Sequence, residues 1–290
     1  MGKLYVVGTP IGNLEDLTRR SIRILGQVAL IAAEDTRVTR KLLNHLNLHV
    51  PLTSCHQHNW QAKLPAILKT LESGDVALVT DAGMPAISDP GSELVAAVAA
   101  EGFVVEVVPG VSAVTTALAA SGLSGDRFLF LGFLPRRNKE RRALLASTIP
   151  LAHNLVIFES PHRVGATLQN LLVALGDRDL AVCRELTKLH EEVFRGSISR
   201  AIEHFESPRG EFVLVLQGAS EADLSRAAEA PNLASIENEL ARLRESGAKA
   251  KEAVASVAES SGLARKEVYK IWLQTAQRCE KKPSVGMAFH

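Results

Sequence analysis

The clearest pattern in the chain lies at residues 76–113, VALVTDAGMPAISDPGSELVAAVAAEGFVVEVVPGVSA. An apolar run, a loop rich in Gly and Pro, a helical segment of small residues and a second apolar run follow one another. Near-continuous apolar runs are typical of strands buried on both faces, and an intervening helix indicates a parallel sheet. Similar runs recur elsewhere: LYVVG (4–8), VALIAAE (28–34), RFLFLG (127–132), NLVIFES (154–160), LAVCREL (180–186) and EFVLVLQG (211–218). The sequence therefore predicts an α/β protein with mostly parallel sheets.

Breaks in this pattern suggest a domain organisation. The segment ASGLSGDR (120–127) separates two sets of strands, and a small, acidic linker covers about 219–231. Beyond it, helical patterns at 233–245, 248–259 and 264–277 have the outline of a helix-turn-helix. We expect α/β domains at 1–120 and 121–220, an extension at 231–278 and a tail at 279–290.

Composition narrows the class of protein. The chain has 290 residues, 46% hydrophobic and 22% charged, with a net charge of +1. This balance is typical of a soluble globular protein, and any nucleic-acid partner would have to meet local basic patches. The three cysteines form no CxxC pair, and the segment CHQHNW (55–60) lacks metal-ligand spacing. We expect a cytoplasmic protein with no metal, no signal peptide and no membrane span.

Three loops rich in Gly, Pro and Ser follow strands, namely GTPIGN (8–13), DAGMPAISDPG (81–91) and PGVSA (109–113). Each alone reads as an ordinary tight turn, in which Asp89 or Ser92 would cap the helix after the second loop. Ligands of open α/β sheets bind at the carboxyl ends of strands, so three such loops predict a pocket for a flat small molecule with polar ends.

Charged clusters allow two interpretations each. In AEDTRVTRKLL (33–43), Asp35 or Thr36 can cap a helix, and Arg37 can either pair with Glu34 or bind phosphate together with Arg40. The run RRNKERR (136–142) is by default a solvated helix face, but beside a cleft it would contact phosphates.

The segment ESPHR (159–163) follows an apolar strand directly. Ser160 as a helix cap and Pro161 in the first turn would explain two of its five residues. Glu159, His162 and Arg163 remain unexplained, which favours a turn that also handles a substrate.

Taken together, GTPIGNLEDLTRRS, AAEDTRVTRKLL, DAGMPAISDPG, PGVSA, FESPHR and RELTKLHEE resemble the ribosomal RNA small subunit methyltransferase I family. That family lies within the tetrapyrrole-methylase-like, class III methyltransferase superfamily. The resemblance runs in order from about residue 3 to residue 217, and EDTRVTRKLL and ESPHR are its most particular motifs.

The resemblance implies two α/β domains of the tetrapyrrole methylase type, with S-adenosylmethionine in the cleft between them, and a homodimer. The implied reaction is methylation of the ribose 2′-oxygen of a cytidine in the decoding region of 16S rRNA, as naked RNA or in the assembled small subunit. The implied cofactor contacts are Pro10, Ile11, Gly12, Met84, Pro85, Ile87, Ser88, Ser112, Ala113, Phe158 and Phe212.

A ribose hydroxyl must lose its proton as the methyl group arrives, which a carboxylate or a neutral imidazole can assist. Glu159 or His162 is our candidate base, with Asp35 as the alternative. Basic side chains would hold the flanking phosphates, and the candidates are Arg37, Arg40, Arg136, Arg137, Arg141 and Arg163.

Two other functions compete with this one. An enzyme of the same fold could methylate a tetrapyrrole precursor or a protein side chain. The basic run at 136–142 and the helical extension discriminate, since neither helps to bind a small macrocycle that carries its own carboxylates. A non-catalytic nucleic-acid-binding protein would use the extension alone. The three ligand loops and the low net charge speak against it.

Overall fold

The computed structural model describes residues 1–221, 224, 233–261 and 263–279. The chain divides into two compact units, Met1–Gly218 and Ala219–His290. Most of the expected linker and nearly all of the expected tail lie outside the described residues. No helix among those described is both long and apolar enough to cross a membrane.

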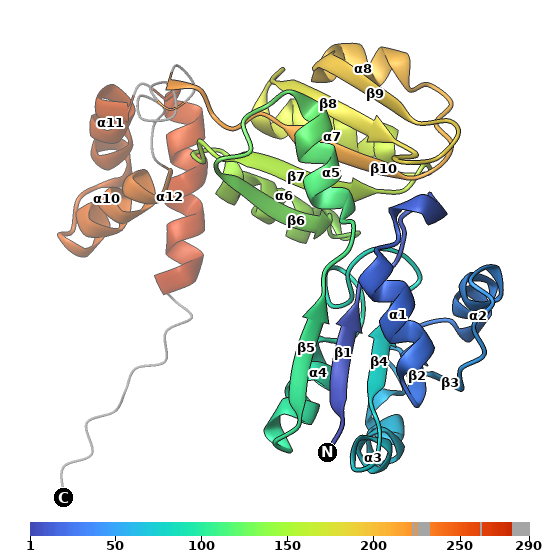
Figure 1. Cartoon of the computed structure of the whole chain (residues 1–290). Helices are drawn as coiled ribbons and strands as arrows, with labels where there is room; N and C mark the ends of the chain where they lie inside the picture. The colour runs from blue at the N-terminus through green and yellow to red at the C-terminus, as the bar shows by residue number, and fades with distance from the viewer. Residues whose placement is uncertain (222–223, 225–232, 262, 280–290) are drawn as a thin grey trace, which may run out of the picture. The chain divides into compact units, whose positions relative to one another are not determined.

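The first unit opens with a five-stranded sheet in which every pairing is parallel (Figure 1). Its order is β3-β2-β4-β1-β5, with bounds β1 (Lys3–Val7), β2 (Leu30–Ala33), β3 (Leu52–Ser54), β4 (Val76–Val79) and β5 (Val104–Val108). The helical segments are η1 (Leu14–Asp16), α1 (Arg19–Gln27), α2 (Thr36–His45), α3 (Trp60–Leu71) and α4 (Ser92–Ala100). The parallel α/β architecture expected from residues 76–113 is confirmed here.

Strand β4 shows why these runs are apolar throughout. All four of its residues are buried, and alternate ones belong to different hydrophobic clusters. Ala77 and Val79 pack on the side of α1 and α2, whereas Val76 and Leu78 pack on the side of α3 and α4. Both faces of the sheet are covered, so its strands carry no alternating polar positions.

A second five-stranded sheet, with the order β6-β7-β10-β8-β9, completes the first unit. Its strands are β6 (Phe128–Phe133), β7 (Asn154–Glu159), β8 (Asp179–Arg184), β9 (Glu192–Ser197) and β10 (Phe212–Leu216). Only β6 and β7 run parallel, and the other three pairings are antiparallel. The expectation of mostly parallel sheets is therefore wrong for this half, because β10 returns between β7 and β8 in the opposite direction.

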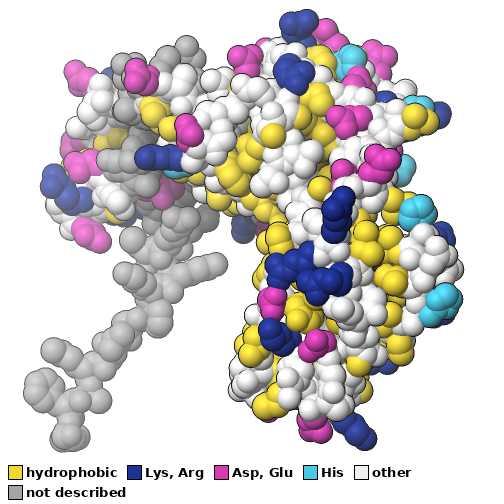
Figure 2. Space-filling model, in the orientation of Figure 1, with side chains coloured by type: hydrophobic (Ala, Val, Ile, Leu, Met, Phe, Trp, Pro, Cys, Tyr) yellow, Lys and Arg dark blue, Asp and Glu magenta, His cyan; other side chains and the backbone are white. Residues whose placement is uncertain are grey.

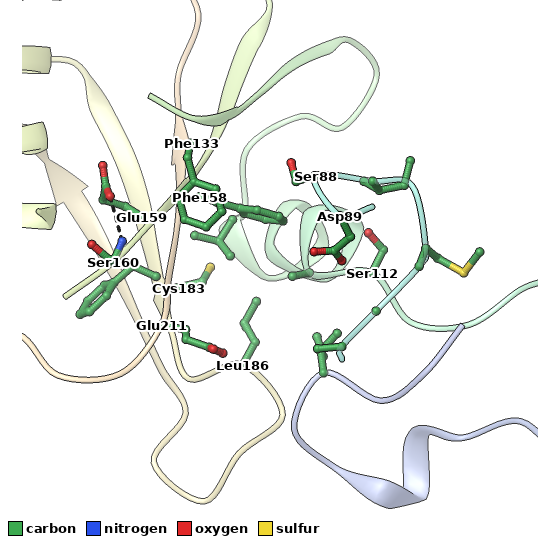
Figure 3. A pocket seen from close by; sticks show the side chains of 18 of the residues that line it. Ser88, Asp89, Ser112, Phe133, Phe158, Glu159, Ser160, Cys183, Leu186 and Glu211 are labelled. Carbon is green, nitrogen blue, oxygen red and sulfur yellow. Dashed lines mark hydrogen bonds between the residues drawn. The ribbon is translucent and has the colours of Figure 1, made fainter. Parts of the chain in front are cut away.

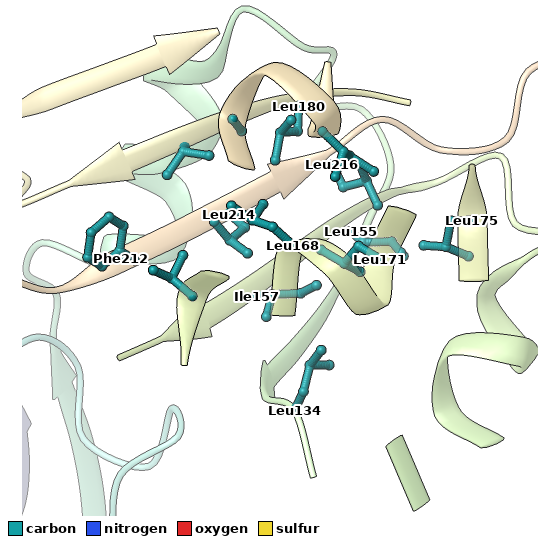
Figure 4. Packing of buried hydrophobic residues seen from close by; sticks show 14 of the residues in the cluster. Leu134, Leu155, Ile157, Leu168, Leu171, Leu175, Leu180, Phe212, Leu214 and Leu216 are labelled. Atoms are coloured by element: carbon teal, nitrogen blue, oxygen red, sulfur yellow. The ribbon is translucent and has the colours of Figure 1, made fainter. Parts of the chain in front are cut away.

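Helices cover both faces of this second sheet as well. Leu214 and Leu216 of β10 pack with α6, α7 and α8 in the core that Figure 4 shows. Val213 and Val215 face the other way, onto α5, which directly follows the last strand of the first sheet. The bounds are α5 (Ala113–Ser121), α6 (Asn138–Thr148), α7 (Val164–Leu175) and α8 (Ile198–His204).

Helix starts differ from expectation at two loops. Helix α4 begins after Gly91, which makes no side-chain capping bond, so neither Asp89 nor Ser92 serves as its cap. Helix α7 begins only at Val164, because the carbonyl of Ser160 accepts the N–H groups of Arg163 and Val164 and closes a separate turn. Asp35 does cap α2, as expected, by accepting from the N–H of Arg37.

In the described residues from 233 onward, the second unit has helices where helical patterns were expected. They are α10 (Leu233–Glu245), α11 (Ala250–Ser261) and α12 (Arg265–Cys279). A separate apolar cluster holds them together, and Leu240 and Val268 are fully buried in it.

Candidate active site

A cavity of about 440 Å³ lies in the first unit, where loops of the first sheet meet strand ends of the second (Figure 3). Ser88, Asp89 and Ser112 stand on one side of it and Phe158, Glu159 and Glu211 on the other. Its volume is within the usual range for small-molecule sites, and its walls are mainly apolar with a few polar groups.

The antiparallel course of β10 accounts for part of this wall. Phe212, the first residue of β10, pairs with Glu159 at the end of β7 and with Arg184 at the end of β8. The start of one strand therefore lies beside the ends of two others. Glu211, Phe212 and Val213 reach the cavity together with Glu159 and Cys183.

The three loops rich in Gly and Pro are held together by close backbone contacts. The N–H groups of Thr9 and Gly83 donate to each other's carbonyls at 2.9 and 3.1 Å. Gly8 lies against Gly110 so closely that a Cβ on Gly8 would come within 2.8 Å of the Gly110 backbone. Glycine is required at this position for the approach itself, independently of backbone conformation.

Strained backbone is concentrated around the site. Of the five non-glycine residues with positive φ in the described part of the chain, four lie in two loops beside the cavities. Ala86 and Ser88 belong to the loop after β4, and Glu185 and Thr187 to the loop after β8. Such conformations cost on the order of 1–3 kcal/mol each and persist where surrounding structure enforces them, often at functional sites.

Carboxylates gather on the first-sheet side. Burial, together with the nearby carboxylates of Glu34 and Asp81, raises the pKa of Asp89 to about 6. Burial also raises the pKa values of Glu34 and Asp81. Asp89 lines the cavity, so a positively charged ligand group there would be favoured.

The turn at 159–163 is organised around Glu159, of which only 2% is exposed. Its carboxylate accepts from the Ser160 N–H at 2.9 Å and from Thr167 Oγ1 at 2.7 Å, and Arg163 Nε lies 3.4 Å away. Arg163 also donates to the Leu134 carbonyl at 2.6 Å. These bonds fix Ser160 and Pro161 in the cavity wall.

The other two candidate bases are placed differently. His162 is exposed and lines neither cavity described here. Asp35 forms an ion pair with Arg37, Nη2 to Oδ2 at 2.6 Å, and this contact lowers the pKa of Asp35 to about 2. Arg37 thus pairs with Asp35, whereas an ion pair with Glu34 was the expected alternative to phosphate binding.

Most predicted cofactor residues line the first cavity, and these are Ile11, Met84, Ile87, Ser88, Ser112, Ala113, Phe158 and Phe212. Pro10 and Gly12 line a second, neighbouring cavity with Ile11, and Pro85 lines neither. Sequence reasoning did not place Asp89, Phe133, Cys183, Leu186 and Glu211 in the site, although all five line it. Phe133, Cys183 and Leu186 lie at or just beyond the carboxyl ends of strands, whereas Asp89 lies late in the loop after β4 and Glu211 just before the start of β10.

The predicted phosphate ligands divide by their partners. Arg137 pairs with Glu140, and Arg141 donates to the carbonyls of Pro135 and Arg136. Arg40 and Arg136 are exposed and form no ion pair within the described part of the chain.

Comparison with known proteins identifies the fold family. Residues 3–202 match the model of the tetrapyrrole (corrin/porphyrin) methylases. Among solved structures, a diphthine synthase aligns with a TM-score of 0.58 at 13% identity, over 78% of this chain and 94% of that one. Uroporphyrin-III-C-methyltransferase from Thermus thermophilus aligns with a TM-score of 0.53 at 22% identity, over 79% and 98%. The chain is thus an S-adenosylmethionine-dependent methyltransferase with the tetrapyrrole methylase fold.

Closer relatives are found by sequence. Ribosomal RNA small subunit methyltransferase I of Halalkalibacterium halodurans is 44% identical over 276 residues, which cover 94% of this chain and 95% of the relative. The protein of that name from Thermotoga maritima is 51% identical over 221 residues, 75% of this chain and 99% of the relative. This chain belongs to the ribosomal RNA small subunit methyltransferase I family.

The first cavity suits S-adenosylmethionine. This cofactor has a flat aromatic base, a sulfonium cation and a charged amino-acid end. Phe133 and Phe158, with ring centroids 5.8 Å apart, offer aromatic walls, and Asp89 offers a carboxylate to a cationic centre. Burial raises the pKa of the Cys183 thiol to about 11, so this wall residue is neutral at physiological pH.

We predict that cofactor affinity depends on the charge of Asp89. A folded-state pKa of about 6, above the ordinary 3.8, means that Asp89 is largely neutral at pH 5 and largely ionised at pH 7. S-adenosylmethionine should bind about tenfold more tightly at pH 7 than at pH 5, because the carboxylate then faces a cation. Calorimetric titration at both pH values measures this change, and Asp89→Asn should bind weakly at each.

The same group has the opposite effect on the stability of the cofactor-free protein. Its raised pKa favours the fold below the unfolded-state pKa, and this contribution is lost as the pH rises through about 6. Asp89→Asn should therefore unfold at a higher temperature than the parent at pH 8. For the affinity prediction, equal binding of S-adenosylmethionine by the parent at pH 5 and pH 7 would contradict a contact between the Asp89 carboxylate and the cofactor.

Proposed function

We propose that this protein transfers a methyl group from S-adenosylmethionine to the ribose 2′-oxygen of a cytidine in the decoding region of 16S rRNA. The supporting observation is a cavity with aromatic walls and a carboxylate in a chain of the ribosomal RNA small subunit methyltransferase I family. The relatives carry that name at 40–51% identity over most of this chain. We place the reaction in the cytoplasm.

Methyl transfer requires little covalent chemistry from the protein itself. When bound, S-adenosylmethionine supplies an activated methyl group. A bond forms between the 2′-oxygen and that carbon as the sulfur–carbon bond breaks, and the hydroxyl proton leaves to a base or to water. Side chains contribute by holding the acceptor in line and excluding bulk water.

Among the candidate bases, Glu159 suits a positioning role best. Its carboxylate is engaged by Ser160, Thr167 and Arg163, all within the protein. The turn that it fixes presents Ser160 and Pro161 to the cavity. We assign Glu159 and Arg163 to fixing this part of the wall of the first cavity, and Arg37, Arg40 and Arg136 to phosphate contacts.

We assign the second unit to RNA docking, and both α/β halves of the first unit to catalysis. The relative from Thermotoga maritima supports the assignment of catalysis to the first unit, because the 221 matched residues, about the length of that unit, make up 99% of it. In α12, Lys266, Tyr269, Lys270 and Leu273 share one helix face and are all exposed. Basic and aromatic side chains together suit phosphates and unstacked bases.

We predict that Lys266→Glu/Lys270→Glu weakens binding to small ribosomal subunits by about 10-fold or more and flattens its salt dependence, because two phosphate contacts are lost. Affinity measured at several salt concentrations checks this prediction. Lys69→Gln, exposed on α3, is the control and should bind like the parent. Unchanged salt dependence in the double variant would contradict a contact between α12 and ribosomal RNA.

We also propose a homodimer. The edge strands β5 and β6 expose apolar side chains, among them Val104, Val107, Phe128 and Leu129. Figure 2 shows hydrophobic side chains on the surface in the region of these strands. A patch of this kind commonly marks a protein interface. A monomer mass in sedimentation equilibrium at micromolar concentration would rule the dimer out.

Labelling of ribosomal RNA tests the function directly. Naked 16S rRNA and small subunits, both from a strain lacking this gene, are incubated with the protein and methyl-labelled S-adenosylmethionine. We expect label in a single alkali-resistant dinucleotide containing a cytidine. Absence of label in both substrates, while cofactor still binds, would direct the search to other acceptors.

A further inference from the structure

A second cavity, of about 430 Å³, adjoins the first. The two share Ile11, Ala82 and Glu211 as lining residues. Its other walls come from the loop after β1, from α2, from the end of β4 and from the loop after β8. A molecule in this cavity would therefore be next to a cofactor in the first.

The apolar part of this second cavity, here called the slot, is lined by two exposed side chains. Leu14 and Val38 are 45% and 39% exposed, although both are large aliphatic residues. They line the cavity together with Pro10 and Ile11. A flat ring placed between them would cover apolar surface that water now contacts.

The polar part contains an unsatisfied group. Thr80 is only 2% exposed, lines this cavity, and has a buried hydroxyl without a hydrogen-bond partner in the structure. Its neighbour Thr9, equally buried, donates to the Thr80 carbonyl at 3.1 Å. An orphaned buried hydroxyl is costly unless a ligand or a water completes it.

Charges of both signs border the slot. Asp81 lines it and uses one carboxylate oxygen, Oδ1, to accept the N–H of Asp35 at 3.1 Å. Lys41, at the same cavity, is exposed and forms no ion pair within the described residues, and Arg40 precedes it on α2. Lys188 is different, because it is neutralised by Glu185 and Glu211 at 2.9 and 2.8 Å.

We propose that the second cavity receives the unstacked acceptor nucleotide, with its base in the slot between Leu14 and Val38. This inference rests on the proposed function and deepens it. Asp81 and Thr80 read the edge of the base, and Lys41 with Arg40 holds the adjoining phosphate. The ribose then lies at the junction formed by Ile11, Ala82 and Glu211, next to the methyl donor.

This arrangement selects cytidine on chemical grounds. A carboxylate accepts a hydrogen bond from the exocyclic amine of cytosine, whereas uracil presents a carbonyl oxygen at the same position. Sequence-specific RNA recognition usually reads splayed-out bases by stacking and edge contacts, which this slot provides. Specificity for the base would thus be set by Asp81, which does not line the first cavity.

Three variants of the full chain test the assignment. Asp81→Asn keeps an oxygen for the Asp35 N–H, Thr80→Val removes only the orphan hydroxyl, and Leu14→Trp fills the slot from an exposed position. Val173→Trp, 88% exposed on α7, is the control for the last of these. Substrates are small subunits assembled from 16S rRNA with cytidine or uridine at the methylated position.

We expect each slot variant to lower kcat/KM for the cytidine substrate by about 10- to 100-fold. The affinity for S-adenosylmethionine should change less than about threefold. Asp81→Asn should in addition lose about tenfold of the preference for cytidine over uridine. Parent-like kcat/KM and preference in the slot variants, with the parent active, would overturn this inference but leave the proposed function intact.

Two further outcomes would also overturn it. A matching loss of cofactor affinity in the slot variants would assign the second cavity to the cofactor. Absence of methylation by the parent on either substrate would remove the proposed function, and this inference with it.

Discussion

Replacing Gly8 by alanine should lower kcat/KM for methyl transfer by about 100-fold or more. The new Cβ would lie 2.8 Å from the Gly110 backbone and 2.7 Å from the sulfur of Met84. Met84 can move, but the backbone of Gly110 leads directly to Ser112 in the cavity wall. Separating these loops by a fraction of an ångström displaces both sides of the cofactor site.

The same substitution should lower the free energy of unfolding by about 2–3 kcal/mol, because a methyl group is forced into a filled space. Thermal denaturation and steady-state kinetics measure the two effects. Gly165→Ala is the matched control, since a Cβ there meets nothing within 4 Å and the residue lies inside α7. It should stabilise the protein by about 0.5–1 kcal/mol and leave kinetics unchanged. A parent-like Gly8→Ala variant would show that the two loops can separate without harm.

Replacing Glu159 by alanine should reduce the free energy of unfolding by about 2–3 kcal/mol and abolish most activity. The substitution leaves the buried Thr167 hydroxyl and the Ser160 N–H without their acceptor and removes the ion partner of Arg163. Arg163 is 27% exposed at its side chain, so solvent limits the cost of losing that pair.

Glu159→Gln separates positioning from proton transfer. The amide oxygen can still accept from Ser160, and the amide nitrogen can donate to Thr167, so a positioning role predicts activity within about tenfold of the parent and an unchanged pH profile. A general base would instead lose roughly 10²–10⁴-fold on amidation. The pH dependence of kcat/KM for both variants discriminates the two roles, and a loss of that size in a folded Gln variant would make Glu159 the base.

The sequence predicted the first sheet better than the second for a physical reason. Strands β7, β8 and β10 are covered on both faces, so their residues are apolar throughout, as in a parallel sheet. A run of apolar residues therefore does not show whether a strand is parallel or antiparallel to its neighbours. Two strands were not predicted at all. They are β3, which has only three residues, and β9, which forms a sheet edge and has no fully buried residue.

The sequence predicted the parts of the site that lie in loops after strands. It did not predict the parts whose position depends on the backbone conformation of a loop or on the start of a strand. The three Gly- and Pro-rich loops border the cavities as expected. Asp89 was read as a helix cap, but the left-handed backbone at Ala86 and Ser88 changes the direction of the loop, and Gly91 precedes the helix instead. Glu211 and Phe212 reach the site from the start of β10. The rule that ligands bind at the carboxyl ends of strands therefore does not identify them.

The position of β10 also has a consequence during synthesis. It is the last strand of its sheet to leave the ribosome, yet it occupies the centre, between β7 and β8. Before it emerges, these two strands lack their common neighbour and the cavity lacks Glu211, Phe212 and Val213. A nascent chain that ends before residue 211 lacks this part of the cavity wall, however well its first sheet has folded, so we expect such a product to be inactive.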